Sequence, residues 1–359
     1  MNNLKKLGLS ALAGSLVAVS AQAGEIAVSG SANITYKTGT AQNSSRSLGT
    51  DKDVAFTGSG ELDNGWSFTV STLLTDAMAV SSSYTSLTMG SMGTLTFGTD
   101  TGGVSYLYDE EVPQAYEQVS DAKQTMANVV GNFMDNNHVM YTPPAMDFMG
   151  ATFQAHLGYT PQASDAVVGD GGQAAFNQTW GAGKELGLTV SYEGIKAGFY
   201  GAERENKTSN NTVTGGRTIG DEFNGAWYVK YSMGPVSIGY SESYLDGGLT
   251  TAVENATASK AERTAGGIFT GEQMSIAFNV NDNMSISYTT SEETYDTQDD
   301  AKTATTNDDD VTESIDAIQV AYSMGGMSIK AYNMEVSNPD QDDNAADQSI
   351  TEIALGFAF

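Results

Sequence analysis

The chain has no cysteine, only two histidines and only six prolines among its 359 residues. Without cysteine it can form neither a disulfide framework nor a thiolate nucleophile. The two histidines, His138 and His156, fall in different predicted strands, so zinc chemistry is poorly supported. Gly102 and Gly103 precede no helical pattern and do not form a phosphate-binding loop. No set of nucleophile, base and orienting group emerges, so we predict that the protein is not an enzyme.

Positive charge and long apolar runs are also scarce. Lysine and arginine number 16 against 44 aspartates and glutamates, which gives a net charge of −28. This balance excludes generic nucleic-acid binding, which needs a basic surface, and fits a surface that meets cations. After the first residues no run approaches the ~20 apolar residues of a membrane helix, and the mean hydropathy is −0.27. The apolar residues can therefore form a continuous surface only if they recur at regular positions on one face of each element.

Residues 1–23 have the three parts of a signal peptide. Lys5 and Lys6 supply the positive segment, Leu7 to Ser20 the apolar segment, and Ala21-Gln22-Ala23 the cleavage site. The alternative is a retained N-terminal anchor, for which the apolar run is short. We expect an exported chain that begins at Gly24 and whose net charge is two units more negative.

The sequence is rich in residues typical of strands, with 17 tyrosines, 13 phenylalanines and 40 glycines. The last stretch, Ser349 to Phe359, shows the pattern most clearly. Large apolar residues alternate there with small or polar ones, and the two faces are Ile353, Leu355, Phe357 and Phe359 against Glu352, Ala354, Gly356 and Ala358. Such a period of two predicts an amphipathic strand that ends on an aromatic carboxyl terminus.

Similar segments recur from Gly24 onward, joined alternately by short turns and long polar loops. The predicted strands lie near Gly24–Lys37, Val54–Leu62, Trp66–Asp76, Ser83–Met89, Thr94–Thr99, His138–Thr142, Ala151–Thr160, Glu185–Tyr192, Lys196–Arg204, Glu222–Tyr231, Val236–Tyr244, Glu272–Val280, Met284–Tyr295, Ile315–Tyr322, Met327–Val336 and the final stretch. These segments predict an all-β protein, a 16-stranded antiparallel transmembrane β-barrel over residues 24–359. An even number of strands lets the last one close on Gly24–Lys37, with Phe357 and Phe359 at the seam. A soluble β-sandwich or β-helix is the alternative, although neither has such regular alternation of loop length.

Four stretches are the most distinctive, and they are GEIAVSGSANITY at 24–36, FTGSGELDNGWSFTVS at 56–71, GTLTFGTDTGG at 93–103 and the final GFAF. These stretches resemble the general (non-specific) bacterial outer-membrane porins, most closely the alphaproteobacterial type. The resemblance implies a homotrimer in the outer membrane of a Gram-negative bacterium, each barrel holding a water-filled pore for passive diffusion of small hydrophilic solutes and ions. It also implies that the third long loop folds inward. The implied partners are outer-membrane lipid, lipopolysaccharide and the barrel assembly machinery. The terminal Phe359 resembles the signal by which that machinery recognises proteins of this class.

Residues 100–137, the third long connection, are too long for an idle surface loop. They carry enough apolar and aromatic residues to pack against a wall, and we expect this constriction loop to narrow the pore. Its acidic residues are Asp100, Asp109, Glu110, Glu111, Glu117 and Asp121. The alternative is an extracellular loop that covers the trimer.

Porins of this type often oppose such acids with a basic cluster, but no lysine or arginine occurs from Asp53 to Ala122. Elsewhere five basic residues have the strand parity of the lumen, and they are Lys37, Lys196, Arg204, Lys230 and Lys330. Each could face the loop or lie at the solvated rim. A pore lined by one sign of charge selects the opposite ion, so we predict a preference for cations.

Three consecutive acids, Asp109, Glu110 and Glu111, offer the hard oxygen ligands that Ca²⁺ prefers. Consecutive acids are more often simply solvated, and we expect no other cofactor. Two further functions stay open from sequence alone. One is a substrate-specific channel with a saturable site, and the other is a non-transport surface barrel such as an adhesin.

Overall fold

The structure is a computed structural model that describes residues 24–40, 46–121, 137–163, 180–207, 220–248, 268–296, 310–342 and 344–359. The predicted signal peptide, residues 1–23, lies outside these ranges. The described chain consists of β-strands, turns and four short 3₁₀ segments. None of the helical segments in these ranges is long and apolar enough to cross a membrane.

Seventeen strands follow one another along the chain. Their bounds are β1 Glu25–Gly39, β2 Ser47–Glu61, β3 Ser67–Leu74, β4 Val80–Thr88, β5 Thr94–Thr99, β6 His138–Thr142, β7 Met146–Phe148, β8 Ala151–Thr160, β9 Trp180–Tyr192, β10 Ile195–Asn206, β11 Glu222–Met233, β12 Val236–Asp246, β13 Ile268–Asn281, β14 Met284–Asp296, β15 Val311–Met324, β16 Met327–Ser337 and β17 Gln348–Ala358. The 3₁₀ segments are η1 Gly90–Met92, η2 Ser105–Leu107, η3 Val119–Asp121 and η4 Pro339–Gln341.

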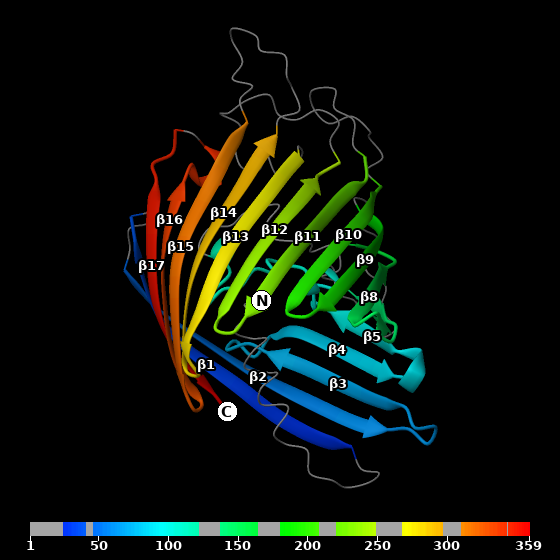
Figure 1. Ribbon diagram of the computed structural model, residues 1–359. Coiled ribbons are helices and arrows are strands. Elements are labelled where there is room, and N and C mark those ends of the chain that lie inside the picture. The colour runs from blue at the N-terminus through cyan, green and yellow to red at the C-terminus, as the bar shows by residue number, and fades with distance from the viewer. Residues whose placement is uncertain are drawn as a thin grey trace.

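The strands form one closed antiparallel barrel (Figure 1). Apart from β6 and β7, each strand pairs with its neighbours in sequence, and β1 pairs with both β2 and β17. The short strands β6 and β7 both pair with β8, so together they form a single interrupted strand of the wall. The wall therefore has sixteen strands, which confirms the predicted fold.

The interruption corrects one predicted connection. The predicted strands His138–Thr142 and Ala151–Thr160 leave Pro143 and Pro144 in the connection between them, but this connection contains β7 and its turn is at Met149 and Gly150. Proline has no backbone N–H to donate to a ladder, so the pair breaks the strand locally. Pairing with β8 resumes at Met146.

The barrel closes between β1 and β17, with Ser31 opposite Ala358 and Lys37 opposite Glu352. Two backbone hydrogen bonds complete the seam, from the Gly30 N–H to the Phe359 carbonyl at 2.8 Å and from the Phe359 N–H to the Gly30 carbonyl at 3.0 Å. The expectation that Gly24 lies at this seam was wrong. Strands in a tilted barrel are staggered, so the first residues of β1 extend past the end of β17 and pair with β2 alone.

The two faces of the wall differ as the period of two predicts. In β17, Ile353 and Phe357 are exposed on the outer face, whereas Ala354 is buried on the inner face. The inner face also carries many hydroxyl and amide side chains, such as Thr289 and Gln319, which are buried under chain that enters the barrel. Large apolar side chains on the outside and polar ones on the inside are the arrangement of a membrane barrel around a polar lumen.

Phe359 contributes two backbone hydrogen bonds to the seam between β1 and β17, so its removal should impair assembly of the barrel. We expect deletion of Phe359 to abolish both backbone hydrogen bonds to Gly30 and to reduce the yield of folded barrel. The measurement is migration on gels with and without heating, since a folded barrel migrates differently from the denatured chain. Normal amounts of heat-modifiable protein would contradict this role of Phe359.

Candidate functional site

Residues 100–121, the first part of the connection between β5 and β6, enter the barrel and run along its inner wall. They are here called the constriction loop. It leaves β5 through Asp100, Gly102 and Gly103, which have φ angles of 50°, 74° and 61°. This left-handed region is open to glycine at little cost, so the two glycines let the chain turn inward immediately after the strand. Residues 122–136 of the predicted loop lie outside the described ranges.

The first attachment of the loop is to β9 through the carboxylate of Glu185. The backbone N–H groups of Val104 and Ser105 donate to it at 2.7 Å and 3.4 Å, and the Tyr200 hydroxyl donates at 2.8 Å. Glu185 is only 4% exposed. A buried carboxylate is tolerated when donors surround it, so Glu185 fixes the start of the loop on the wall.

Aromatic packing reinforces this attachment. Tyr108 of the loop stacks on Tyr200 with ring centroids 5.7 Å apart and lies 6.2 Å from Tyr228. Its hydroxyl is 3.2 Å from that of Thr189. Burial raises the pKa of Tyr108 to about 12, so its phenol is neutral at physiological pH. All three rings are buried, which makes this cluster part of the wall packing.

The second attachment is to β15, and it uses both ends of one amide. The Gln319 Oε1 accepts the Tyr116 N–H at 2.7 Å, and the Gln319 Nε2 donates to the Glu117 carbonyl at 2.7 Å. On β14 the Ser287 hydroxyl accepts the Ala115 N–H at 2.9 Å. Side chains of the wall thus substitute for a neighbouring strand and satisfy the backbone of the loop.

The loop reaches furthest around the barrel through Tyr116. Its hydroxyl donates to the Glu352 Oε1 of β17 at 2.7 Å, and burial is the main cause that raises the pKa of Tyr116 well above its usual value. On β13 the Ser275 hydroxyl donates to the Pro113 carbonyl. The constriction loop therefore follows the inner wall from β9 to β17, and these contacts fix its course.

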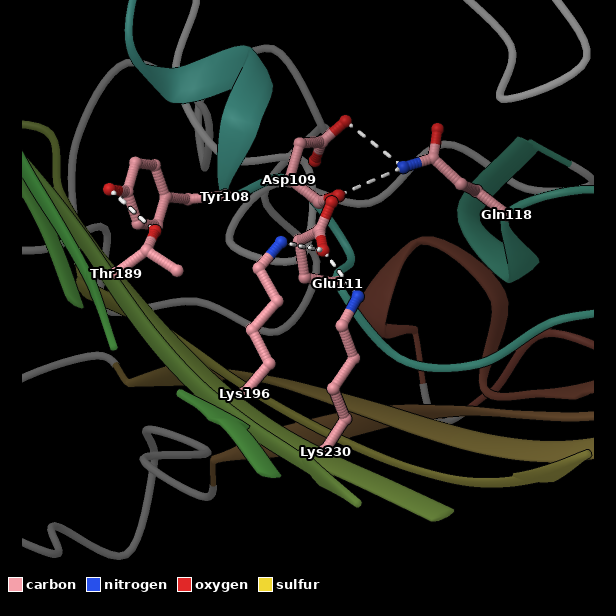
Figure 2. A network of polar contacts seen from close by, with 7 residues as sticks. All are labelled: Tyr108, Asp109, Glu111, Gln118, Thr189, Lys196 and Lys230. Atoms are coloured by element: carbon pink, nitrogen blue, oxygen red, sulfur yellow. Dashed lines mark hydrogen bonds and ion pairs between the residues drawn. The ribbon is translucent and has the colours of Figure 1, made fainter. Parts of the chain in front are cut away.

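Between the two attachments, Glu111 lies against two lysines of the wall (Figure 2). Its Oε2 is 2.5 Å from the Nζ of Lys230 on β11 and 3.6 Å from the Nζ of Lys196 on β10. Asp109 points elsewhere, because its carboxylate accepts the Gln118 side-chain amide at 3.1 Å. One predicted acid and two predicted bases thus form a compact ion-pair cluster inside the barrel.

The other predicted loop acids are spread along the loop. Asp100 begins it, half-buried. Glu110 is 4% exposed and has a φ of 44°, and Glu117 is 6% exposed. The side chain of Asp121 lies outside the description. The part of each acid in selectivity stays a prediction, but the structure does not bring these carboxylates together into a single ring.

The remaining predicted bases also lie on the lumen side. Lys37 is 4.0 Å from Glu352, and the Lys330 Nζ is 5.4 Å from the centre of the Tyr116 ring. Arg204 pairs with Glu222 at 2.7 Å and stacks 3.6 Å above the Trp180 ring. These bases come from β1, β10, β11 and β16, while the wall from β3 to β5 has none.

Two of the three acids that could bind calcium are engaged by other side chains. Glu111 is engaged by two lysines and Asp109 by Gln118. Within the described ranges no group of three acidic, histidine or cysteine side chains is placed to hold a metal ion. A calcium ion at Asp109, Glu110 and Glu111 stays a prediction, and two of these three carboxylates already have partners within the protein.

Sequence reasoning missed the wall residues that hold the loop, above all Glu185, Gln319 and Glu352. A weak signal was available for Glu185, because it is a long polar residue at a lumen position of β9, whose other lumen residues are small. The contacts themselves join residues 81 to 236 positions apart. No local pattern records such pairings.

Comparison with known proteins agrees with this architecture. A family model described as Gram-negative porin matches residues 8–266, and a comparison with curated proteins returned no match. Among solved structures, a porin refined at 1.8 Å resolution has a TM-score of 0.61 at 14% identity and covers 93% of this chain and 100% of its own. Salmonella typhi OmpF in complex with daunomycin has a TM-score of 0.64 at 10% identity, covering 93% and 97%.

A Vibrio cholerae OmpT structure described as a trimer form has a TM-score of 0.54 at 12% identity, covering 94% of this chain and 100% of its own. At such identities these likenesses establish the fold alone. The family match covers well over half of the chain, and the closed barrel with its inward loop agrees with it. The chain therefore belongs to the Gram-negative porin family and forms a channel of the outer membrane.

Proposed function

We propose that this channel passes small hydrophilic solutes and ions by passive diffusion and prefers cations. The supporting observation is the pairing of the lumen bases. Of the five bases predicted to face the lumen, Lys196 and Lys230 pair with Glu111, Lys37 with Glu352 and Arg204 with Glu222. Three carboxylates thus face four of these bases, which leaves little net positive charge on this wall, so the acidic excess of the chain determines the sign of the field along the lumen.

The size of the effect supports the same conclusion. Two unit charges about 4 Å apart interact by about 1 kcal/mol in water and about 4 kcal/mol at a protein surface. A paired lysine therefore attracts a passing anion far less than an unpaired one. Because the whole chain carries a net charge of −28, the remaining field concentrates cations near the pore.

The test of this preference is the reversal potential of the channel in a planar bilayer under a potassium chloride gradient. We expect a sign that reports higher permeability for potassium than for chloride. A reversal potential of the opposite sign would overturn the cation preference while leaving the channel itself established.

Passive diffusion is preferred to a saturable solute site because the aromatic rings against which the constriction loop packs are covered. Tyr108, Tyr116 and Tyr228 are between 1% and 6% exposed, since the constriction loop and the wall pack against them. A solute would need exposed rings to slide along. The barrel also supports a channel over an enzyme or an adhesin, because the polar residues within the described ranges line a passage and converge on no reacting group.

We further propose that the channel is a homotrimer that contacts outer-membrane lipid and lipopolysaccharide and is inserted by the barrel assembly machinery. The trimer form of the Vibrio cholerae OmpT structure supports the assembly. The exposed apolar outer wall supports contact with lipid. Cross-linking of the native protein in mild detergent tests the assembly, and a monomer at all concentrations would contradict it.

A further inference from the structure

A row of acidic residues crosses the outer face of the neighbouring strands β12, β13 and β14 (Figure 1). Glu242 is directly opposite Glu272, and Glu272 is directly opposite Glu292. All three side chains have the parity of the outer face and are exposed. Like charges at opposed positions of an antiparallel pair are destabilising. The outer wall is therefore stabilised here when a cation lies over the row.

The strands around the row bring no positive charge to this face. In the described strands β10 to β14 the basic residues are Lys196, Arg204 and Lys230, and all three have the parity of the lumen. The outer positions of these five strands hold no lysine or arginine. The medium around the barrel is therefore a natural source of a cation for the row.

The row lies at the level where the apolar band of the outer wall ends. Toward the short turns the outer positions next to it are mostly apolar or aromatic, and they include Ile238, Tyr240, Met274, Ile276, Phe278, Ile286 and Tyr288. Toward the long loops they are mostly polar, and they include Tyr244, Asp246, Thr270, Thr294 and Asp296. In a membrane barrel the long loops are extracellular. The row is thus at the level of the lipid headgroups of the outer leaflet.

A hollow of about 480 Å³ opens on the same face, beside and along the row. Gly225 lines it and has no side chain to fill it, while the rings of Phe199, Trp227 and Tyr244 bound it. The carboxylate of Glu242 accepts the indole N–H of Trp227 at 3.0 Å and so fixes the orientation of that ring. The hollow is therefore aromatic on one side and acidic on the other.

This lining suits an ammonium group better than a metal ion. Within the described ranges no three acidic, histidine or cysteine side chains are placed to hold a metal ion together. Magnesium gives up its water reluctantly, whereas alkylammonium groups are attracted to the faces of aromatic rings. Carboxylates beside those rings add the opposite charge that such a group needs.

We propose that this hollow binds the ammonium headgroup of an outer-leaflet lipid. The positive group lies against the ring of Trp227 and over the carboxylates of Glu272 and Glu292. The acyl chains of the lipid then follow the apolar positions below the row, such as Ile238 and Ile276. The inference deepens the proposed contact with lipid and rests on it, while ion flow through the lumen does not depend on it.

The experiment titrates the full-length mature protein in detergent with phosphatidylcholine or with phosphatidylglycerol of the same acyl chains, and native mass spectrometry measures the retained lipid. Only phosphatidylcholine carries an ammonium group, and the wild type should bind it roughly fivefold more tightly. The double variant Glu272→Gln/Glu292→Gln should lose this preference. Trp227→Leu keeps the wall apolar but removes the ring, so it should weaken the binding of phosphatidylcholine alone.

The matched control is Asp316→Asn/Glu335→Gln, which makes the same change in net charge. These two acids are also opposed to each other on the outer face, on β15 and β16, but they do not line the hollow. The control should keep the wild-type preference for phosphatidylcholine. Heat-modifiable migration on gels establishes that each variant is folded.

Three results would overturn the inference. One is equal binding of the two lipids by the wild type, and another is a loss of preference in the control as large as in Glu272→Gln/Glu292→Gln, because the total outer charge would then be responsible. The third is stronger binding of phosphatidylglycerol once magnesium is added, because the row would then hold metal ions. Failure to retain any lipid would instead contradict the proposed lipid contact itself, so the two failures are distinguishable.

Discussion

Glu111→Gln should shift the ion preference of the channel toward anions. The glutamine has nearly the same shape, but it leaves Lys196 and Lys230 without the carboxylate that lies 3.6 Å and 2.5 Å from them. Two positive charges then act on ions in the lumen. A change of about 1 kcal/mol in the potential corresponds to roughly a fivefold change in the permeability ratio. Reversal potentials in a salt gradient measure this ratio directly.

The matched control is Glu242→Gln on β12. Glu242 lies on the outer face, where it accepts hydrogen bonds from Trp227 at 3.0 Å and Tyr240 at 2.7 Å. This variant makes the same change in net charge outside the lumen, so the ion preference should stay at the wild-type value. Equal shifts in both variants would show that total charge, and not the Glu111 cluster, determines selectivity.

Gln319→Ala should widen the channel and make its current noisier. The substitution removes the partner of both the Tyr116 N–H and the Glu117 carbonyl. Leaving a buried polar backbone group without its partner costs about 1–3 kcal/mol, so this part of the constriction loop should detach for part of the time. Single-channel conductance, open-channel noise and the size limit for neutral solutes should all increase.

Gln273→Ala is the control for this variant. Gln273 is also 1% exposed on the lumen face, two strands away on β13, and its amide makes no hydrogen bond in the described part of the chain. The same truncation there should leave the size limit unchanged. If Gln319→Ala passed only the solutes that the wild type passes, the two-point attachment of the loop would be wrong as an account of the constriction.

The barrel was predictable because the membrane imposes a rule on every second residue. In β17 the outer positions must be apolar and the inner ones must suit a packed, polar lumen, and Ile353 and Ala354 follow that rule. The ends of strands were less predictable where charged residues interrupt the alternation of apolar and polar positions. The predicted second strand began at Val54, but β2 begins at Ser47, because Asp51, Lys52 and Asp53 lie within the strand and resemble a loop.

The site was predictable only in outline. The length and apolar content of residues 100–137 indicated an inward loop, and strand parity placed Lys196 and Lys230 in the lumen. Which acid meets which base depends on barrel stagger and on the course of the loop, and neither is encoded locally. The alphaproteobacterial type and the role of each loop acid stay predictions.

Glu352 gives the folding of this protein an order. The residue lies on the last strand, where it is opposite Lys37 at the seam and also accepts the hydrogen bond from Tyr116 of the constriction loop. The hydrogen bond of Tyr116 therefore cannot form until Glu352, which lies 236 residues later in the chain, is in place. Bringing such distant segments together has a high entropic cost until closure itself supplies the compensating contacts. A nascent chain that lacks β17 thus has an open wall and an incompletely attached constriction loop. The pairing of β17 with β1 both closes the barrel and completes the attachment of the loop that narrows the pore.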